Sequence, residues 1–101
     1  MSKNLCRDKD LGRTGHGCTT VIGTKATQST VFANGKPISR QNDPALPHLI
    51  KRGLLCVGHR GAKINEGSSS VFCQGVPVAR INDSFDRGKM IRGSNNVFAG
   101  G

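Results

Sequence analysis

Hydrophobic residues come along this chain singly or in runs of two to four, separated by polar and turn-forming residues. Two stretches repeat this pattern, residues 29–43 (STVFANGKPISRQND) and residues 69–83 (SSVFCQGVPVARIND). They align without a gap at an offset of 40 residues and are identical at eight of fifteen positions. A shorter third copy, residues 93–101, shares the central Val-Phe pair. We therefore predict repeated units that pack with pseudo-three-fold symmetry around a shared core.

Each of the two full copies predicts a β-hairpin. Asn-Gly at 34–35 is the strongest short hairpin signal, because both residues tolerate positive φ, and Gln-Gly at 74–75 is a weaker version of it. Pro37 and Pro77 follow two residues after each glycine, where the missing N–H suits an edge strand or the start of a strand. No helical period is present. The pattern favours an all-β fold of short hairpins.

An arginine followed by Asn-Asp ends each full copy. Arg40 precedes Asp43, and Arg80 precedes Asp83, by three residues. Because the pair recurs at a strand-breaking turn, we expect a side-chain hydrogen bond or ion pair between the arginine and the aspartate. This is a structural role and not a catalytic one.

The composition allows only a thin hydrophobic core. The chain has 101 residues, of which 35% are hydrophobic, with 14 Gly, four Phe and no Trp or Tyr. We expect a single domain over residues 1–101. Domains of this size and composition usually need a disulfide, a metal or a partner for stability.

The N-terminal residues are polar and do not resemble a secretory signal, and no apolar run approaches the length of a membrane span. We therefore expect synthesis and folding in a cytoplasm, with the four cysteines as thiols or metal ligands rather than disulfides. The formal charge is +9, which could attract phosphate. The basic residues are scattered and aromatic residues for base stacking are few, which argues against nucleic-acid binding.

Candidate metal ligands gather between the two full copies. His48, Cys56 and His59 lie in a connection, residues 44–63, that shows little regular pattern. Zinc binds imidazole nitrogen and thiolate sulfur, and the Cys-x-x-His spacing lets one turn present both to the same ion. Cys18, two residues after His16, is the alternative sulfur ligand.

The other two cysteines predict no ligand. Cys73 stands where Ala33 and Ala99 stand in the other copies, which indicates a small apolar filler. Cys6 lies near the terminus and is expected to be a plain thiol.

The two motifs Gly-Lys-Pro-Ile-Ser-Arg (residues 35–40) and Gly-Val-Pro-Val-Ala-Arg (residues 75–80) resemble the proline-alanine-alanine-arginine (PAAR) repeat. Thr-Gly-His-Gly at residues 14–17 looks like the family's Thr-x-His-Gly-Gly element. The resemblance covers roughly residues 12–101. Ser39, Ile38 and Val78 depart from the alanines of the motif, and Asn replaces Gly before each Asp.

The resemblance implies a small all-β cone with a metal ion near its vertex. Members of the family bind this ion through three histidines and one cysteine, which implies His16, His48, Cys56 and His59 as ligands here. We expect Zn²⁺, with iron as the alternative. Four protein ligands would close the coordination shell, so the site would be structural and not hydrolytic.

The resemblance also implies a function. The broad base would sit on a trimeric β-helical spike, one cap per trimer, and the vertex would touch the target cell envelope transiently, without stable membrane insertion. We favour a non-enzymatic tip of a phage baseplate spike, located on the virion tail. The alternative is a type VI secretion spike tip that also carries an effector.

Two other classes of protein remain as alternatives. A zinc-ribbon-like nucleic-acid-binding module would fit the charge and the cysteine content, but it needs paired Cys-x-x-Cys knuckles, which the chain lacks. A metal-dependent enzyme needs an open metal position and a general base, whereas the chain has only six Asp and Glu.

Overall fold

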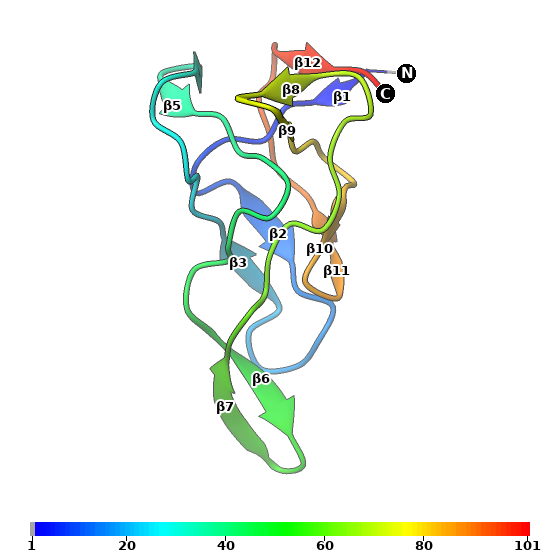
Figure 1. Ribbon diagram of the computed structural model, residues 1–101. Helices are drawn as coiled ribbons and strands as arrows, with labels where there is room; N and C mark the ends of the chain where they lie inside the picture. Colours follow the sequence, from blue (N-terminus) through cyan, green and yellow to red (C-terminus); the bar gives the residue numbers. More distant parts are fainter. Residues whose placement is uncertain (1) are drawn as a thin grey trace.

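The molecule tapers from a broad end, which carries both termini, to a narrow end formed by one hairpin (Figure 1). A computed structural model describes residues 2–101, with principal extents of 41 × 26 × 22 Å. The described chain contains strands and turns and no helix, which confirms the all-β prediction. The strands are β1 (Lys3–Asn4), β2 (Leu11–Arg13), β3 (Val21–Gly23), β4 (Phe32–Ala33), β5 (Lys36–Pro37), β6 (His48–Arg52), β7 (Leu55–His59), β8 (Phe72–Cys73), β9 (Val76–Pro77), β10 (Ser84–Phe85), β11 (Gly88–Met90) and β12 (Phe98–Ala99).

Three two-stranded antiparallel sheets form the broad end. Two of them are the predicted hairpins, β4–β5 and β8–β9. Their turns have the positive φ angles that this tight connection requires, 56° and 76° at residues 34–35 and 53° and 80° at residues 74–75. The third sheet pairs β12 with β1, so Phe98 lies opposite Asn4.

The first strand of the chain therefore completes the third repeat. Leu5-Cys6-Arg7 leads to Asp10 with the spacing by which Val78-Ala79-Arg80 leads to Asp83. The third copy is split between the two ends of the sequence, residues 93–101 and residues 3–10, and β1–β12 pairing joins the halves. The internal repeat in the sequence predicts only the C-terminal half of this copy, residues 93–101.

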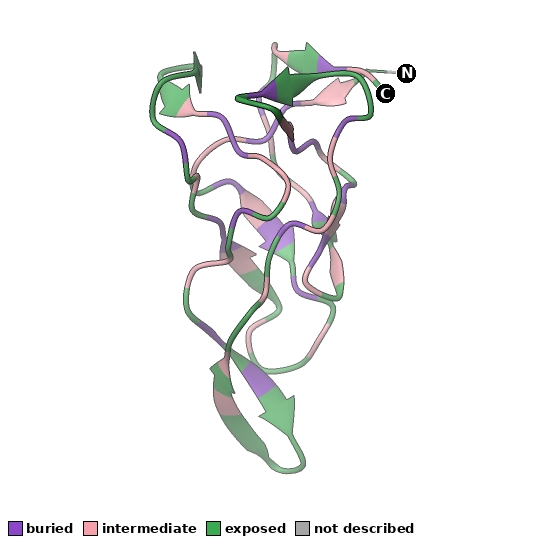
Figure 2. Cartoon of the chain, viewed as in Figure 1, coloured by how far each residue is buried: buried purple, intermediate pink, exposed green. Residues whose placement is uncertain are grey.

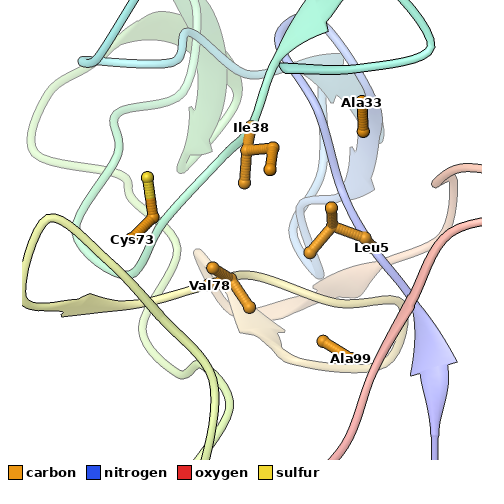
Figure 3. Close-up of a cluster of buried hydrophobic side chains, with 6 residues drawn as sticks. All are labelled: Leu5, Ala33, Ile38, Cys73, Val78 and Ala99. Atoms are coloured by element: carbon orange, nitrogen blue, oxygen red, sulfur yellow. The ribbon is translucent and has the colours of Figure 1, made fainter. Parts of the chain in front are cut away.

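The upper core takes two residues from each repeat. Its buried members are Leu5, Ala33, Ile38, Cys73, Val78 and Ala99 (Figure 3). Each pair is one small residue from a first strand and one residue that follows the second strand. Cys73 fills the alanine position, as expected. This core is shared by all three units because no single unit could bury enough apolar area.

Below this core, three buried aspartates close three equivalent turns. In each turn the aspartate Oδ2 accepts a hydrogen bond of 2.8 Å from the backbone N–H of an arginine three residues earlier. The pairs are Arg7 with Asp10, Arg40 with Asp43, and Arg80 with Asp83. This arrangement satisfies backbone donors that no strand partner reaches.

The guanidinium groups of these turns do not all behave alike. Arg80 makes the expected ion pair with Asp83, at 2.9 Å. Arg40 does not pair with Asp43, because the Thr27 hydroxyl already donates to Asp43 Oδ1. The Arg40 guanidinium donates instead to the Cys73 carbonyl and to Thr27. The expected ion pair is therefore present in one of the two copies in which it was predicted.

The four-stranded sheet β10–β11–β2–β3 forms the middle of the molecule. Its core contains Cys6, Ile64, Ala79, Phe85 and Met90. Phe85 lies so close to Gly12 that a Cβ at position 12 would be 2.2 Å from the ring. Within the described chain, no helix has the length and apolar character needed to cross a membrane.

The narrow end is the β6–β7 hairpin, most of whose surface is exposed (Figure 2). It runs from the pair His48–His59 to the pair Arg52–Leu55. The sequence predicted little regular structure here. The hairpin is not predicted because residues 54–57 (LLCV) form an unbroken apolar run across the turn and the second strand, without the alternation of apolar and polar residues by which a half-buried strand is recognised.

Candidate metal centre

Three histidines and one aspartate meet where the hairpin joins the four-stranded sheet. His16 comes from the loop after β2, His48 begins β6, His59 ends β7, and Asp86 lies in the turn between β10 and β11. One ligand atom from each lies within 4.8 Å of all the others. The cluster therefore draws on three regions that are remote in sequence: the loop after β2, the β6–β7 hairpin and the β10–β11 turn.

The spacing of these atoms fits a single tetrahedral ion. Asp86 Oδ2 is 2.8 Å from His16 Nε2, 3.1 Å from His48 Nε2 and 3.4 Å from His59 Nδ1. His59 Nδ1 is also 3.1 Å from His16 Nε2 and 3.0 Å from His48 Nε2. Zinc bonds of about 2.0–2.1 Å place tetrahedral ligands about 3.3 Å apart. The separations between these ligand atoms are thus already close to the edge lengths of such a tetrahedron.

In His16 and His48, the hydrogen bond made by Nδ1 determines which ring nitrogen is available to bind a metal. His16 Nδ1 lies 3.0 Å from the Gly17 carbonyl, and His48 Nδ1 lies 2.9 Å from the Leu46 carbonyl. A carbonyl only accepts hydrogen bonds, so each neutral ring carries its proton on Nδ1 and turns the lone pair of Nε2 inward. Lone pairs and a carboxylate that face each other repel, and a cation between them removes the repulsion.

Burial favours the metal-binding form of the cluster. The side chains of His48, Asp86 and His16 are almost fully buried, and that of His59 is slightly more accessible. Burial lowers the pKa of His59, while the nearby Asp86 carboxylate acts in the opposite direction. A lowered pKa keeps the imidazole neutral at physiological pH, and neutral imidazole is the form that binds metal.

Cys56 does not join the cluster. Its Sγ is bonded to Sγ of Cys18, with Cα atoms 5.9 Å apart, and Asp86 takes the fourth place. The reason is the strand: residues three apart in β7 point to opposite faces, so His59 faces the cluster and Cys56 faces away. The expectation that all four cysteines are thiols or ligands is corrected for Cys18 and Cys56.

The sequence offered a weak signal for Asp86. It lies in a two-residue turn, with a φ of 53°, and belongs to neither repeated Asn-Asp element. An acid outside the repeats, in a chain with six acids, was the available clue. Nothing local linked it to three histidines that lie 27 or more residues earlier in the sequence.

The disulfide and the cluster connect the same two segments. His16 and Cys18 lie in the loop after β2, and Cys56 and His59 lie in β7. The remaining cysteines are elsewhere: Cys6 is buried in the middle core, where burial raises its pKa, and Cys73 is in the upper core. The cysteines of the described chain therefore do not gather as a zinc ribbon would require.

The sequence matches one family model, described as the PAAR motif, over residues 11–91. The matched range contains His16, His48, His59 and Asp86 as well as both disulfide cysteines. A comparison with curated proteins finds no match.

Proposed function

The chain belongs to the PAAR motif family, and from this we propose that it is a single-domain, non-enzymatic tip of a phage baseplate spike. The PAAR motif supports a spike-tip role in contractile injection systems. In our proposal one copy, residues 1–101, caps the blunt end of a trimeric β-helical spike. The narrow end then points toward the target cell envelope and touches it transiently.

The broad end supports docking on a three-fold partner. Phe32, Phe72 and Phe98 occupy equivalent positions in the three units and are 52%, 54% and 54% exposed. Val31 and Val71 lie beside the first two and are also exposed. Large apolar side chains gathered at one end of a small protein are characteristic of a docking surface. Three equivalent contacts suit one cap on each trimer.

The cluster supports a structural metal, which we propose is Zn²⁺. His16, His48, His59 and Asp86 would hold it, and four protein ligands leave a tetrahedral ion no open position for substrate. The ion would supply a rigid cross-link between these three regions. This is why we propose a mechanical role and no catalysis. Iron, which prefers additional ligands, is the alternative that elemental analysis excludes or identifies.

The disulfide supports a location outside the producing cell. The Cys18–Cys56 bond persists in oxidising surroundings, which a tip meets once it leaves the producing cell. We place the protein on the phage tail because Ser39 and the two Asn-Asp turns depart from the tighter bacterial motif. A type VI spike tip that carries an effector is the other setting.

Co-purification tests the proposal. The full chain is expressed with the trimeric β-helical spike encoded in its own genomic neighbourhood, and we expect one cap per trimer. Phe32→Ser combined with Phe72→Ser should weaken the complex at least about tenfold, because apolar contact area is lost. Leu54→Ser combined with Leu55→Ser, which likewise removes two exposed apolar side chains but at the narrow end, is the matched control and should not weaken it. Failure of the wild-type chain to bind that spike would refute the proposal.

A further inference from the structure

The end of the β6–β7 hairpin, residues 51–55 (the hairpin tip), exposes leucine side chains at the narrowest point of the molecule. Gly53 and Leu54 form the two-residue turn, with Gly53 at a φ of 60°, the arrangement of a type II′ turn. Leu54 is 97% exposed and Leu55 is 68% exposed. Leu54 thus has the highest exposure among the large hydrophobic residues of the described chain.

Positive charge flanks these leucines. Lys51 and Arg52 are exposed and immediately precede the turn, and exposed Arg60 follows β7. No acidic residue occurs between residues 44 and 65. Asp86, the acid that contacts the base of the hairpin, is buried among the histidines. The hairpin tip is therefore an apolar point with a cationic surround and no compensating negative charge of its own.

The hairpin is held in place just behind these side chains. The Cys18–Cys56 disulfide anchors β7 at the residue after Leu55. On the other edge of the hairpin, Thr19 N–H donates to the Leu49 carbonyl at 3.1 Å, and Cys18 pairs with Ile50. A surface held in its binding conformation loses less entropy on binding than a flexible loop does.

The shape of the hairpin tip favours a lipid bilayer over a folded protein as its partner. Cavities of about 640 and 610 Å³ border the histidines and not the tip. A specific protein interface buries roughly 1,200 Å² or more of complementary surface, which a convex two-residue turn does not offer. A bilayer needs no complementary shape: its interface accepts leucines, and its anionic headgroups attract lysine and arginine.

We propose that the hairpin tip binds the surface of an anionic lipid bilayer. Leu54 and Leu55 enter the boundary between headgroups and acyl chains, and Lys51 and Arg52 lie against lipid phosphates. Binding is peripheral and reversible, because two leucines and a few cations are far from a membrane span. The inference adds a lipid partner to the proposed spike-tip function, and its test needs no spike.

A tryptophan placed at the turn reports the contact directly, because the chain has no Trp of its own. Leu54→Trp is mixed with vesicles of phosphatidylcholine that contain about one-third phosphatidylglycerol, an anionic surface. We expect a blue shift of the emission, reduced by salt and absent with pure phosphatidylcholine. Phe72→Trp, at the broad end, is the matched control and should not shift. No shift for Leu54→Trp, or an equal shift for both variants, overturns the proposal.

Co-sedimentation of charge variants gives a second, independent measurement. Lys51→Gln with Arg52→Gln should weaken binding to the same anionic vesicles, by about fivefold per cation removed. Lys25→Gln with Lys36→Gln makes the same change in net charge on exposed residues outside the hairpin and should have a smaller effect. Equal losses would indicate attraction by net charge alone and would overturn the proposed site. Spike binding by the hairpin variants should be unchanged, so the two proposals fail separately.

Discussion

Asp86 Oδ2 lies 2.8 Å from His16 Nε2, although the two residues are 70 positions apart in the sequence. This contact makes Asp86, and not a cysteine, the fourth member of the histidine cluster. We predict that Asp86→Ala loses stoichiometric zinc, with affinity reduced at least about tenfold, as do alanine variants of the three histidines. Metal analysis of the purified proteins measures this.

Cys56→Ser is the control for that measurement. Its sulfur is bonded to Cys18, so the variant should keep its metal. Retention of metal by Asp86→Ala together with loss by Cys56→Ser would make Cys56 the ligand and contradict a site of three histidines and Asp86.

Acid should destabilise the protein through His59. The pKa of His59 is lowered in the folded protein from its ordinary value of 6.5, so the unfolded chain binds more protons around that pH. Stability should therefore fall as pH drops below about 6.5, and metal binding adds to the effect because it also requires neutral imidazole. Thermal unfolding at pH 7.5 and pH 5.5 measures the change. A His59→Gln variant should show a smaller pH dependence, and an unchanged one would argue against this origin.

The stability lost when the Cys18–Cys56 disulfide is removed should depend on whether a metal is bound. The two cysteines are 38 residues apart, and closing such a loop stabilises a domain by about 2–4 kcal/mol. An ion held by His16 and His59 would close almost the same loop. We therefore expect removal of the disulfide to cost this whole amount when the metal has been chelated, and less when the metal is bound. Denaturant unfolding of Cys18→Ser with Cys56→Ser, with and without chelator, gives the comparison, and equal losses would contradict the shared-loop argument.

Ser39→Ala should stabilise the protein. The Ser39 side chain is fully buried, and its hydroxyl has no hydrogen-bond partner among the described residues. Of its counterparts in the other units, Ala79 has no polar side-chain atom, and the Cys6 thiol donates to the Arg92 carbonyl. Removing an unsatisfied buried hydroxyl should raise the free energy of unfolding by about 1 kcal/mol. Chemical denaturation measures the change, and a loss of stability would show that the hydroxyl is in fact satisfied.

The aspartates of the equivalent turns should contribute different amounts to the free energy of unfolding. Asp83→Asn leaves the buried Arg80 guanidinium without its anion and should cost about 3 kcal/mol or more. Asp43→Asn breaks no ion pair, because Arg40 binds elsewhere, and should cost about 1 kcal/mol. Equilibrium unfolding of both variants tests the difference. Equal costs would mean that the ion pair contributes nothing beyond the backbone hydrogen bond.

The local part of the fold could be predicted from the sequence. Asn-Gly at 34–35 and Gln-Gly at 74–75 sit in tight turns with positive φ, and the repeat around them identified two of the three units. Hairpin turns depend on a few neighbouring residues, so their chemistry is visible in the sequence. The sequence does not reveal the half-repeat at residues 3–10, because its other half lies in the remote segment 93–101 and only the pairing of β1 with β12 joins them.

The candidate site was predictable in composition but not in geometry. The histidines could be named from the sequence, since the chain has only three. Which fourth group joins them depends on the faces of an extended strand and on a turn between β10 and β11. In β7 the alternation of side chains sends Cys56 to Cys18 and His59 to Asp86. The sequence by itself determined the turns and the ligand types, because these depend on local chemistry. Only the tertiary structure decided the partners, because they are brought together by pairings between segments remote in the chain.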